Sequence, residues 1–223
     1  MIRLLENESA FWSESPAARL AGIDEAGRGP LAGPVVAGAV EIPESLIGHL
    51  AENDLAGLTD SKQLTETERE HFFAVLTSHP NIRQAAGVCS HTEIDRLNIL
   101  RATHLAMNRA VSALPDGLPV HAFIDGLPVK NFPCPSTAIV KGDSKSLLIA
   151  AASIIAKVTR DRLMLGYDAQ FPGYGFAKHK GYPTPEHLDA LRRLGVSPIH
   201  RRTYAPVAAI LNPGLFRTNN PDF

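Results

Sequence analysis

Four acidic residues follow short apolar segments that are typical of buried β-strands. Asp24 and Glu25 end the first of these segments, Asp125 ends a later one, and Asp143 follows another. Magnesium and manganese prefer carboxylate oxygens, whereas zinc sites usually contain histidine or cysteine. Crowded carboxylates cannot all stay ionised unless cations balance them. The pattern therefore predicts a site for Mg²⁺ or Mn²⁺, in which two ions about 3.5–4 Å apart would promote hydrolysis of a phosphodiester.

A glycine-rich turn, Gly27-Arg28-Gly29, follows the first acidic pair. Glycines let a ligand approach main-chain N–H groups closely, and the arginine favours an anionic one. Side chains alternate along a strand, so Asp24 and Glu25 can share one site only at a frayed strand end where the backbone turns. For this segment alone, a surface strand that ends in a β-turn with two solvated acids remains an alternative.

The other acids also have plain alternatives. Asp125-Gly126 fits an ordinary turn, and Asp143 fits the N-cap of the helix that follows it. The tripeptide Asp60-Ser61-Lys62 repeats Asp143-Ser144-Lys145, and spacing does not tell which copy binds metal. Asp161 lies eighteen residues after Asp143, about 27 Å along a helix at a rise of ~1.5 Å per residue. We therefore interpret Asp161 as a structural or helix-end charge.

Strands and helices alternate along the chain, as in α/β folds. Strands are predicted at 19–24, 32–42, 82–89, 120–124 and 136–140, and 43–64 is predicted to be a loop. Capping boxes at Thr65/Glu68 and Ser90/Glu93 begin two helices, the second a single long one that reaches residue 114. An almost wholly apolar segment, 144–164, predicts a buried central helix. Shorter helices are predicted over 184–194 and 204–211.

At 223 residues the chain is the size of one domain. We divide it into a short leader of uncertain order (1–18), a catalytic core (19–165) and a C-terminal helical extension of the same domain (166–223). The formal net charge is −1, so a polyanion would need a local basic patch. The two cysteines are far apart in the sequence, which favours reduced thiols and a cytoplasmic location. No segment is typical of a membrane span or a secretion signal.

Taken together, these motifs resemble bacterial ribonuclease HII over nearly the whole chain. The matching segments are 22–34, 60–64, 124–126, 141–143, 151–161 and 179–182. The resemblance implies a ribonuclease H-like α/β fold, with a mixed five-stranded sheet flanked by helices and a C-terminal helical extension. It also implies an endonuclease that cuts the RNA strand of RNA–DNA hybrids. Such an enzyme would also incise on the 5′ side of a single ribonucleotide in duplex DNA, leaving 3′-hydroxyl and 5′-phosphate ends.

The resemblance also assigns roles to individual residues. The metal-binding acids would be Asp24, Glu25, Asp125 and Asp143, which selects the second Asp-Ser-Lys copy. Gly27, Arg28 and Gly29 would sense the RNA–DNA junction through the ribose 2′-hydroxyl, which distinguishes RNA from DNA. Tyr182 would stack on the following deoxyribose. The cations that we expect to hold phosphates, together with Arg28, are Lys62, Lys145, Lys178, His179 and Lys180.

Two other functions remain open at this point. A DNA-specific nuclease such as a junction resolvase could use the same sheet. A non-catalytic protein that binds hybrids is the other alternative, although four acids facing a polyanion would repel phosphate. For partners we expect RNA–DNA hybrids and ribonucleotide-containing DNA, no membrane, and a monomeric protein.

Overall fold

A computed structural model describes residues 3–213. Its centre is a five-stranded sheet in the order β3-β2-β1-β4-β5, in which β2 is antiparallel to β1 and β3, and β4 is parallel to β1 and β5. The strands are β1 (Leu20–Ala26), β2 (Val35–Glu41), β3 (Arg83–Cys89), β4 (His121–Asp125) and β5 (Ser136–Ile139). The predicted mixed sheet is confirmed.

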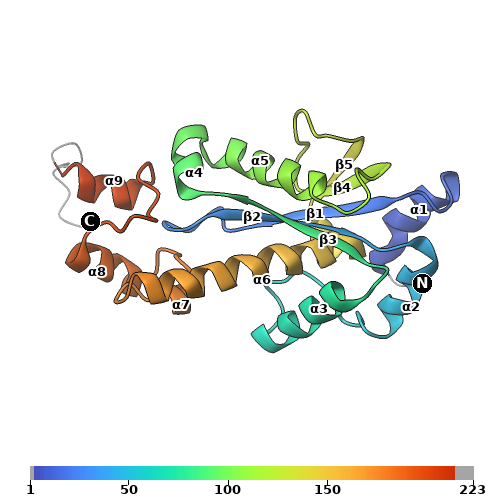
Figure 1. The fold of residues 1–223 in the computed structure, drawn as a ribbon, viewed down its shortest axis with the longest axis horizontal. Coiled ribbons are helices and arrows are strands. Elements are labelled where there is room, and N and C mark those ends of the chain that lie inside the picture. Colours follow the sequence, from blue (N-terminus) through green and yellow to red (C-terminus); the bar gives the residue numbers. More distant parts are fainter. Residues whose placement is uncertain (1–2, 214–223) are drawn as a thin grey trace.

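Helices cover both faces of this sheet (Figure 1). The helices before β4 are α1 (Glu6–Glu14), α2 (Glu44–Glu52), α3 (Glu66–Ser78), α4 (His91–Leu97) and α5 (Ile99–Ser112). Those after β5 are α6 (Leu147–Gln170), α7 (Phe176–His179), α8 (Pro185–Leu194) and α9 (Ala205–Leu211). Short 3₁₀ turns occur at Arg3–Leu5 and Gly142–Ser144. No helix within residues 3–213 combines the length and apolarity needed to cross a bilayer.

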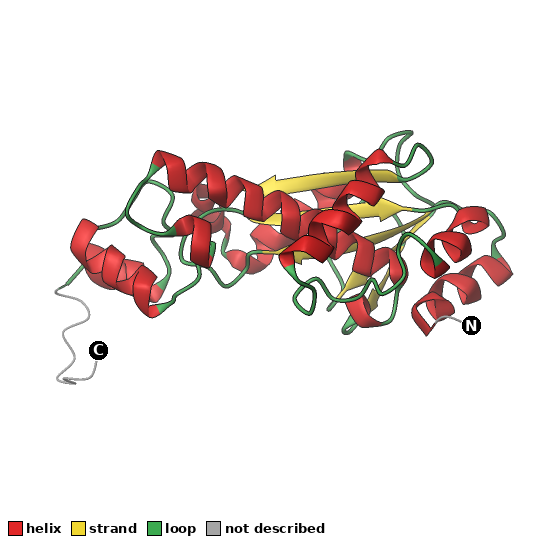
Figure 2. Ribbon diagram, turned by 90° about the horizontal axis from the view of Figure 1, so that it is seen from below, coloured by secondary structure: helices red, strands yellow, loops and turns green. Residues whose placement is uncertain are grey.

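The sheet lies between α5 on one face and the long helix α6 on the other, while α7, α8 and α9 gather at one end (Figures 1 and 2). Helix α6 approaches β1 and β2 very closely. A Cβ atom at Gly22 would overlap the backbone of Leu148, and one at Gly38 would overlap that of Ala152. Glycine is therefore needed at both positions, and the apolar first half of α6 is buried as predicted.

Three predicted elements differ from the structure. The segment 43–64 contains helix α2, which buries Ile47 and Leu50 on one side. The long helix after Ser90 is two helices, because Asn98 adopts a left-handed φ of 71° and its side chain caps α5. The central helix begins at Leu147 with Ser146 as its N-cap, so the N-cap alternative for Asp143 is wrong. Both capping boxes are present as predicted.

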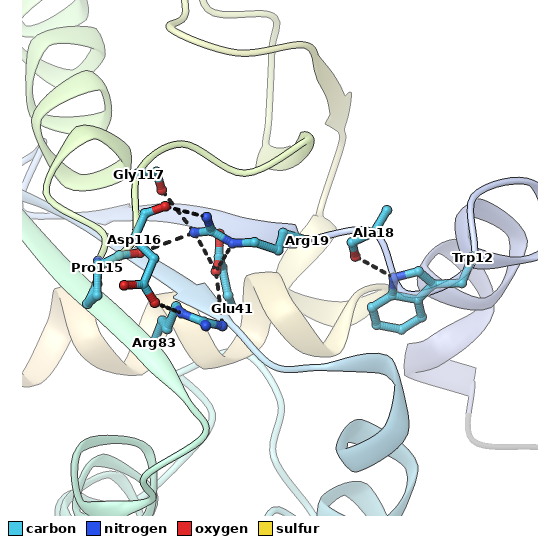
Figure 3. A network of polar contacts seen from close by, with 8 residues as sticks. All are labelled: Trp12, Ala18, Arg19, Glu41, Arg83, Pro115, Asp116 and Gly117. Carbon is cyan, nitrogen blue, oxygen red and sulfur yellow. Dashed lines mark hydrogen bonds and ion pairs between the residues drawn. The ribbon is translucent and has the colours of Figure 1, made fainter.

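A polar network around the buried Glu41 holds the start of β1 (Figure 3). The guanidinium of Arg19 donates to Glu41 at the end of β2, and it also donates to the backbone carbonyls of 115–117. Arg83 on β3 pairs with Asp116 at 2.9 Å and lies 3.9 Å from Glu41. These contacts join β1, β2 and β3 to the turn before β4, which positions the strands that carry Asp24 and Asp125.

The leader, predicted to be of uncertain order, forms helix α1 and docks on the start of α6. The buried Glu8 accepts hydrogen bonds from the Ser146 hydroxyl at 2.6 Å and from the Leu148 N–H at 3.1 Å. Asn7 donates to the Lys145 carbonyl at 2.8 Å. Burial raises the pKa of Glu8. Helix α1 therefore holds the segment that follows Asp143.

Replacing Glu8 by alanine is expected to destabilise the protein. The substitution leaves the buried donors of Ser146 and Leu148 without their acceptor, which should lower the free energy of unfolding by about 1–3 kcal/mol. Denaturant unfolding of Glu8→Ala measures this change. Glu6→Ala is the matched control, because Glu6 is an exposed carboxylate in the same helical turn. Equal effects of the two substitutions would contradict the proposed anchoring.

Candidate functional site

Three of the four predicted metal-binding acids lie together where β1 and β4 end. One carboxylate oxygen each from Asp24, Glu25 and Asp125 lie within 4.8 Å of one another. The parallel ladder between β1 and β4 ends at Ile23 and Ile124. From there onward β1 is unpaired on that side, and the side chains that follow can share the open space.

We expected β1 to fray at the acidic pair. This is wrong for the side of β1 that faces β2. The antiparallel ladder with β2 continues through Asp24 and Glu25 to Ala26. The strand therefore stays regular along β2 while its β4 side is open. Loss of one of two neighbouring ladders is enough to let Asp24 and Glu25 reach the same space, and the backbone does not need to turn between them.

Burial and mutual repulsion make this cluster costly without a cation. Burial raises the pKa of Asp24 well above its ordinary value, and the charges of Glu25 and Asp125 raise it further. These effects outweigh the hydrogen bond that Asp24 accepts from the Glu25 N–H at 2.7 Å. Burial also raises the pKa of Glu25, despite its ion pair with Arg28 at 3.1 Å. An all-carboxylate donor set under such repulsion fits a hard divalent cation.

Asp143 lies beside this cluster but not within it. It sits in the 3₁₀ turn after β5, and the N–H of the preceding Gly142 donates to Asp125 Oδ1 at 2.6 Å. Burial raises the pKa of Asp143, and the charge of Asp125 adds to the effect. Among the described residues, Asp24, Glu25 and Asp125 form the close group, and Asp143 is a neighbour that interacts electrostatically with it.

A pocket of about 500 Å³ opens next to Glu25. Its walls combine the glycine turn with cations and aromatic surface, and it is lined by Glu25, Ala26, Gly27, Arg28, Gly29, Ser61, Lys62, Ile99, Lys157 and Tyr182. The half-exposed ring of Tyr182 lies against Gly29, where a Cβ atom would be 3.5 Å from the ring. Burial alone would lower the pKa of Lys62, but the charges of Asp60, Asp24 and the other acids raise it.

The remaining predicted phosphate-binding cations face their own chain. Lys145 donates to the Val140 carbonyl at 2.7 Å, and Lys180 donates to the Ala177 carbonyl. Lys178 pairs with Glu186 at 2.6 Å, and His179 is buried. The structure therefore does not gather these residues in the pocket that Lys62 and Tyr182 line.

Sequence reasoning missed Lys157, which lines the pocket from α6 and pairs with Asp161 at 2.7 Å. Asp161 is therefore part of a helical ion pair, as its interpretation as a structural charge suggested. Arg160 and Arg201 were also missed, and both are almost fully buried behind the glycine turn. One sequence signal could have pointed to Lys157 and Arg160: both are cations in a largely apolar helix. Such a cation needs a polar partner when it is buried.

Comparison with known proteins decides among the open functions. The model of the ribonuclease HII family matches residues 21–207. The chain belongs to the ribonuclease HII family. It is therefore a metal-dependent ribonuclease, a hydrolase of phosphodiester bonds that acts on RNA–DNA hybrids. The non-catalytic alternative and the DNA-specific nuclease are both wrong.

Bacterial ribonucleases HII are similar to this chain along most of its length. The enzyme of Geobacter sulfurreducens is 50% identical over 208 residues, which cover 91% of this chain and 92% of that protein. The enzyme of Geobacillus kaustophilus is 51% identical over 193 residues, which cover 86% of this chain and 70% of that protein. This similarity extends well beyond the acidic motifs to the whole core.

Solved structures agree on the fold. Ribonuclease H2 from Pyrococcus horikoshii has a TM-score of 0.71 at 30% identity and covers 87% of this chain and 98% of its own. Bst-RNase HIII, crystallised with Mn²⁺, has a TM-score of 0.66 at 19% identity and covers 88% of this chain and 70% of its own. The second similarity concerns the fold alone.

Addition of Mn²⁺ or Mg²⁺ is expected to raise the melting temperature at pH 7.5. An ion that binds only the folded state adds ~2.7 kcal/mol at about one hundred times its Kd, which corresponds to roughly 5–10 °C for a chain of this size. Differential scanning calorimetry across a metal titration measures the shift. Asp125→Asn should lose most of it, and an undiminished shift in that variant would place the ion elsewhere.

Proposed function

We propose that this ribonuclease HII cleaves the RNA strand of hybrids and also incises duplex DNA on the 5′ side of a single ribonucleotide, leaving 3′-hydroxyl and 5′-phosphate ends. Such an activity would serve the removal of ribonucleotides from DNA. The observation that carries the proposal is the adjacency of the three-carboxylate cluster to the pocket lined by Gly27, Arg28, Gly29 and Tyr182. One side of Glu25 would then face the scissile phosphate and the other a ribose.

In this proposal Asp24 and Asp125 are the central ligands of two divalent ions, Mg²⁺ or Mn²⁺, and Glu25 and Asp143 complete one site each. Bound ions of this kind supply activation of the attacking water and stabilisation of the leaving oxygen. The chain holds Asp24 on β1 and Asp125 on β4 at a fixed separation through the β1–β4 ladder. No side chain is needed as a nucleophile.

The glycine turn and Tyr182 would select the substrate. Main-chain groups at Gly27 and Gly29 leave room for a ribose, and a 2′-hydroxyl can both donate and accept hydrogen bonds. Tyr182, which is 41% exposed, would stack on the deoxyribose that follows. Arg28 and Lys62 would hold phosphates at the mouth of the pocket, with Lys145 and Lys180 contributing after release from their backbone acceptors. Residues 166–223, of which 214–223 lie outside the described part of the chain, would form the substrate-binding extension of a monomeric enzyme.

Cleavage of three matched duplexes tests the proposal. Wild-type protein with Mn²⁺ is incubated with all-DNA, with DNA containing one ribonucleotide and with an RNA–DNA hybrid, and the products are resolved at single-nucleotide resolution. We expect one cut on the 5′ side of the lone ribonucleotide, multiple cuts in the hybrid and none in DNA. If the hybrid is cut while the duplex with one ribonucleotide stays intact, the incision activity is refuted.

A further inference from the structure

Two arginines lie inside the protein beneath the glycine turn, and neither has a carboxylate partner in the described part of the chain. Arg160 on α6 is 1% exposed, and Arg201, between α8 and α9, is 0% exposed. Among residues 3–213, neither forms an ion pair. A buried charge without a counter-ion is costly, so these guanidiniums need strong hydrogen-bond acceptors.

Backbone carbonyls of the segment 27–34 are those acceptors. Arg160 Nε donates to the Pro34 carbonyl at 3.0 Å, and its terminal nitrogen donates to the Ala32 carbonyl at 3.3 Å. The acceptors of the Arg201 guanidinium are the carbonyls of Gly27 (2.6 Å), Arg28 (2.8 Å), Gly33 (3.0 Å) and Pro34 (3.2 Å) and the hydroxyl of Tyr204 (3.0 Å). The Tyr204 hydroxyl in turn donates to the Arg28 carbonyl at 2.8 Å.

These bonds determine which way the turn presents its N–H groups. In a trans peptide, the C=O of one residue and the N–H of the next point in opposite directions, and the described chain has no cis peptide. Because the carbonyls of Gly27 and Arg28 face Arg201, the N–H groups of Arg28 and Gly29 face away from it. Neither N–H has an acceptor within residues 3–213, and both residues line the pocket.

Close packing makes this orientation rigid. Gly27 has a φ of 94°, and a Cβ atom there would overlap the Arg160 side chain. The turn is also joined to the Tyr182 loop, because the Leu31 N–H donates to the Gly181 carbonyl at 2.8 Å. The Arg160 guanidinium lies 5.9 Å from the centre of the Tyr182 ring. The two arginines thus contact the backbone or the ring of both proposed substrate-reading elements.

We propose that Arg201 is a positioning residue for ribonucleotide recognition, which directs the Arg28 and Gly29 N–H groups into the pocket, with Tyr204 and Arg160 supporting the same orientation. This inference rests on the proposed function. Arg201 does not touch substrate itself. Its fork of donors holds two consecutive carbonyls at once, and the single ammonium of a lysine cannot reproduce that geometry.

The inference predicts a selective defect in Arg201→Lys. A duplex with one ribonucleotide has a single productive register, so a displaced turn should reduce its cleavage about 100-fold. A uniform hybrid offers a ribose in every register, so its cleavage rate should fall markedly less. The ratio of the cleavage rate of the single-ribonucleotide duplex to that of the hybrid should therefore decrease. Affinity for Mn²⁺, measured by calorimetry without substrate, should stay unchanged because the carboxylate cluster is intact.

Two further variants keep the test independent of folding defects. Tyr204→Phe removes only the hydroxyl between Arg201 and the Arg28 carbonyl, and it should shift the same ratio about fivefold, the worth of one hydrogen bond. Arg202→Lys makes the same chemical change at an exposed neighbour and should behave like wild type. Melting temperatures accompany every variant.

The outcomes separate this inference from the proposed function. If wild-type protein leaves the single-ribonucleotide duplex intact, the proposed function fails and takes the inference with it. Suppose that wild type cuts that duplex, but that Arg201→Lys and Tyr204→Phe keep the wild-type ratio of cleavage rates, even where both rates fall equally. The inference alone is then overturned. Should Arg201→Lys not fold, the ratio for Tyr204→Phe decides.

Discussion

Asp125→Asn is expected to abolish cleavage of RNA–DNA hybrids while binding of the hybrid persists. The substitution keeps the size of the side chain, its hydrogen-bond acceptor for the Gly142 N–H and the β4 backbone. It removes one negative charge from the three-carboxylate cluster. Metal ions supply several kcal/mol of transition-state stabilisation, and a loss of about 4 kcal/mol lowers the rate on the order of a thousandfold. Single-turnover cleavage and filter binding measure the two quantities.

Asp54→Asn is the matched control for this experiment. Asp54 is an exposed carboxylate just after α2 and is not one of the three clustered acids, so the same change there should leave the rate unaltered. Because one acid fewer also repels the polyanion less, hybrid affinity in Asp125→Asn should be equal to or higher than that of wild type. A wild-type cleavage rate in Asp125→Asn would remove Asp125 from the metal site.

Asp24→Asn is expected to have opposite effects on activity and stability. Asp24 is 5% exposed and lies among charges of the same sign, so its ionised form destabilises the metal-free protein. Removing that charge should raise the free energy of unfolding by roughly 1–2 kcal/mol, because substitutions that relieve a destabilised active site commonly stabilise a protein at the cost of activity. The cleavage rate should fall on the order of a thousandfold. Calorimetry in EDTA and single-turnover assays with Mn²⁺ measure the two effects.

The pH dependence of this stability gain has a definite sign. The pKa of Asp24 is raised in the folded state, so the folded protein binds its proton more tightly than the unfolded chain does. The cost of ionisation is therefore fully present above the folded pKa and disappears as the pH falls towards the ordinary aspartate value. The free energy of unfolding of Asp24→Asn should exceed that of wild type at pH 7.5, and the difference should shrink in acid. A destabilised Asp24→Asn at pH 7.5 in EDTA would contradict this account.

Local sequence patterns were sufficient for most of the fold. The five strands follow from short apolar segments, and the starts of α3 and α4 follow from capping boxes at Thr65 and Ser90, which are interactions within four residues. Helix α2 and the break at Asn98 were not predicted. In both cases contacts with the rest of the protein outweigh weak local preferences: α2 is stabilised by burying Ile47 and Leu50, and Asn98 accepts a left-handed φ to redirect the chain.

The candidate site also combines features that local sequence predicts with features that depend on tertiary contacts. The types of the acids and their positions at strand ends were readable from the sequence, because a carboxylate has the same ligand chemistry wherever it stands. The geometry that unites Asp24 with Glu25 was not, since it depends on one ladder of β1 ending before the other. The direction of Lys145 and Lys180 towards backbone carbonyls also depends on the folded chain.

The sequence by itself determined the kind of chemistry to expect: carboxylates suited to a hard metal ion, a glycine turn beside them and a sheet to carry both. Only the tertiary structure decided that Asp24, Glu25 and Asp125 form the close group with Asp143 beside it. It alone placed Arg201, 174 residues beyond Gly27, behind the turn. The physical reason is that residue types and short periodicities are local properties, whereas distances between charges and the direction of a peptide group arise from packing among segments far apart in the chain.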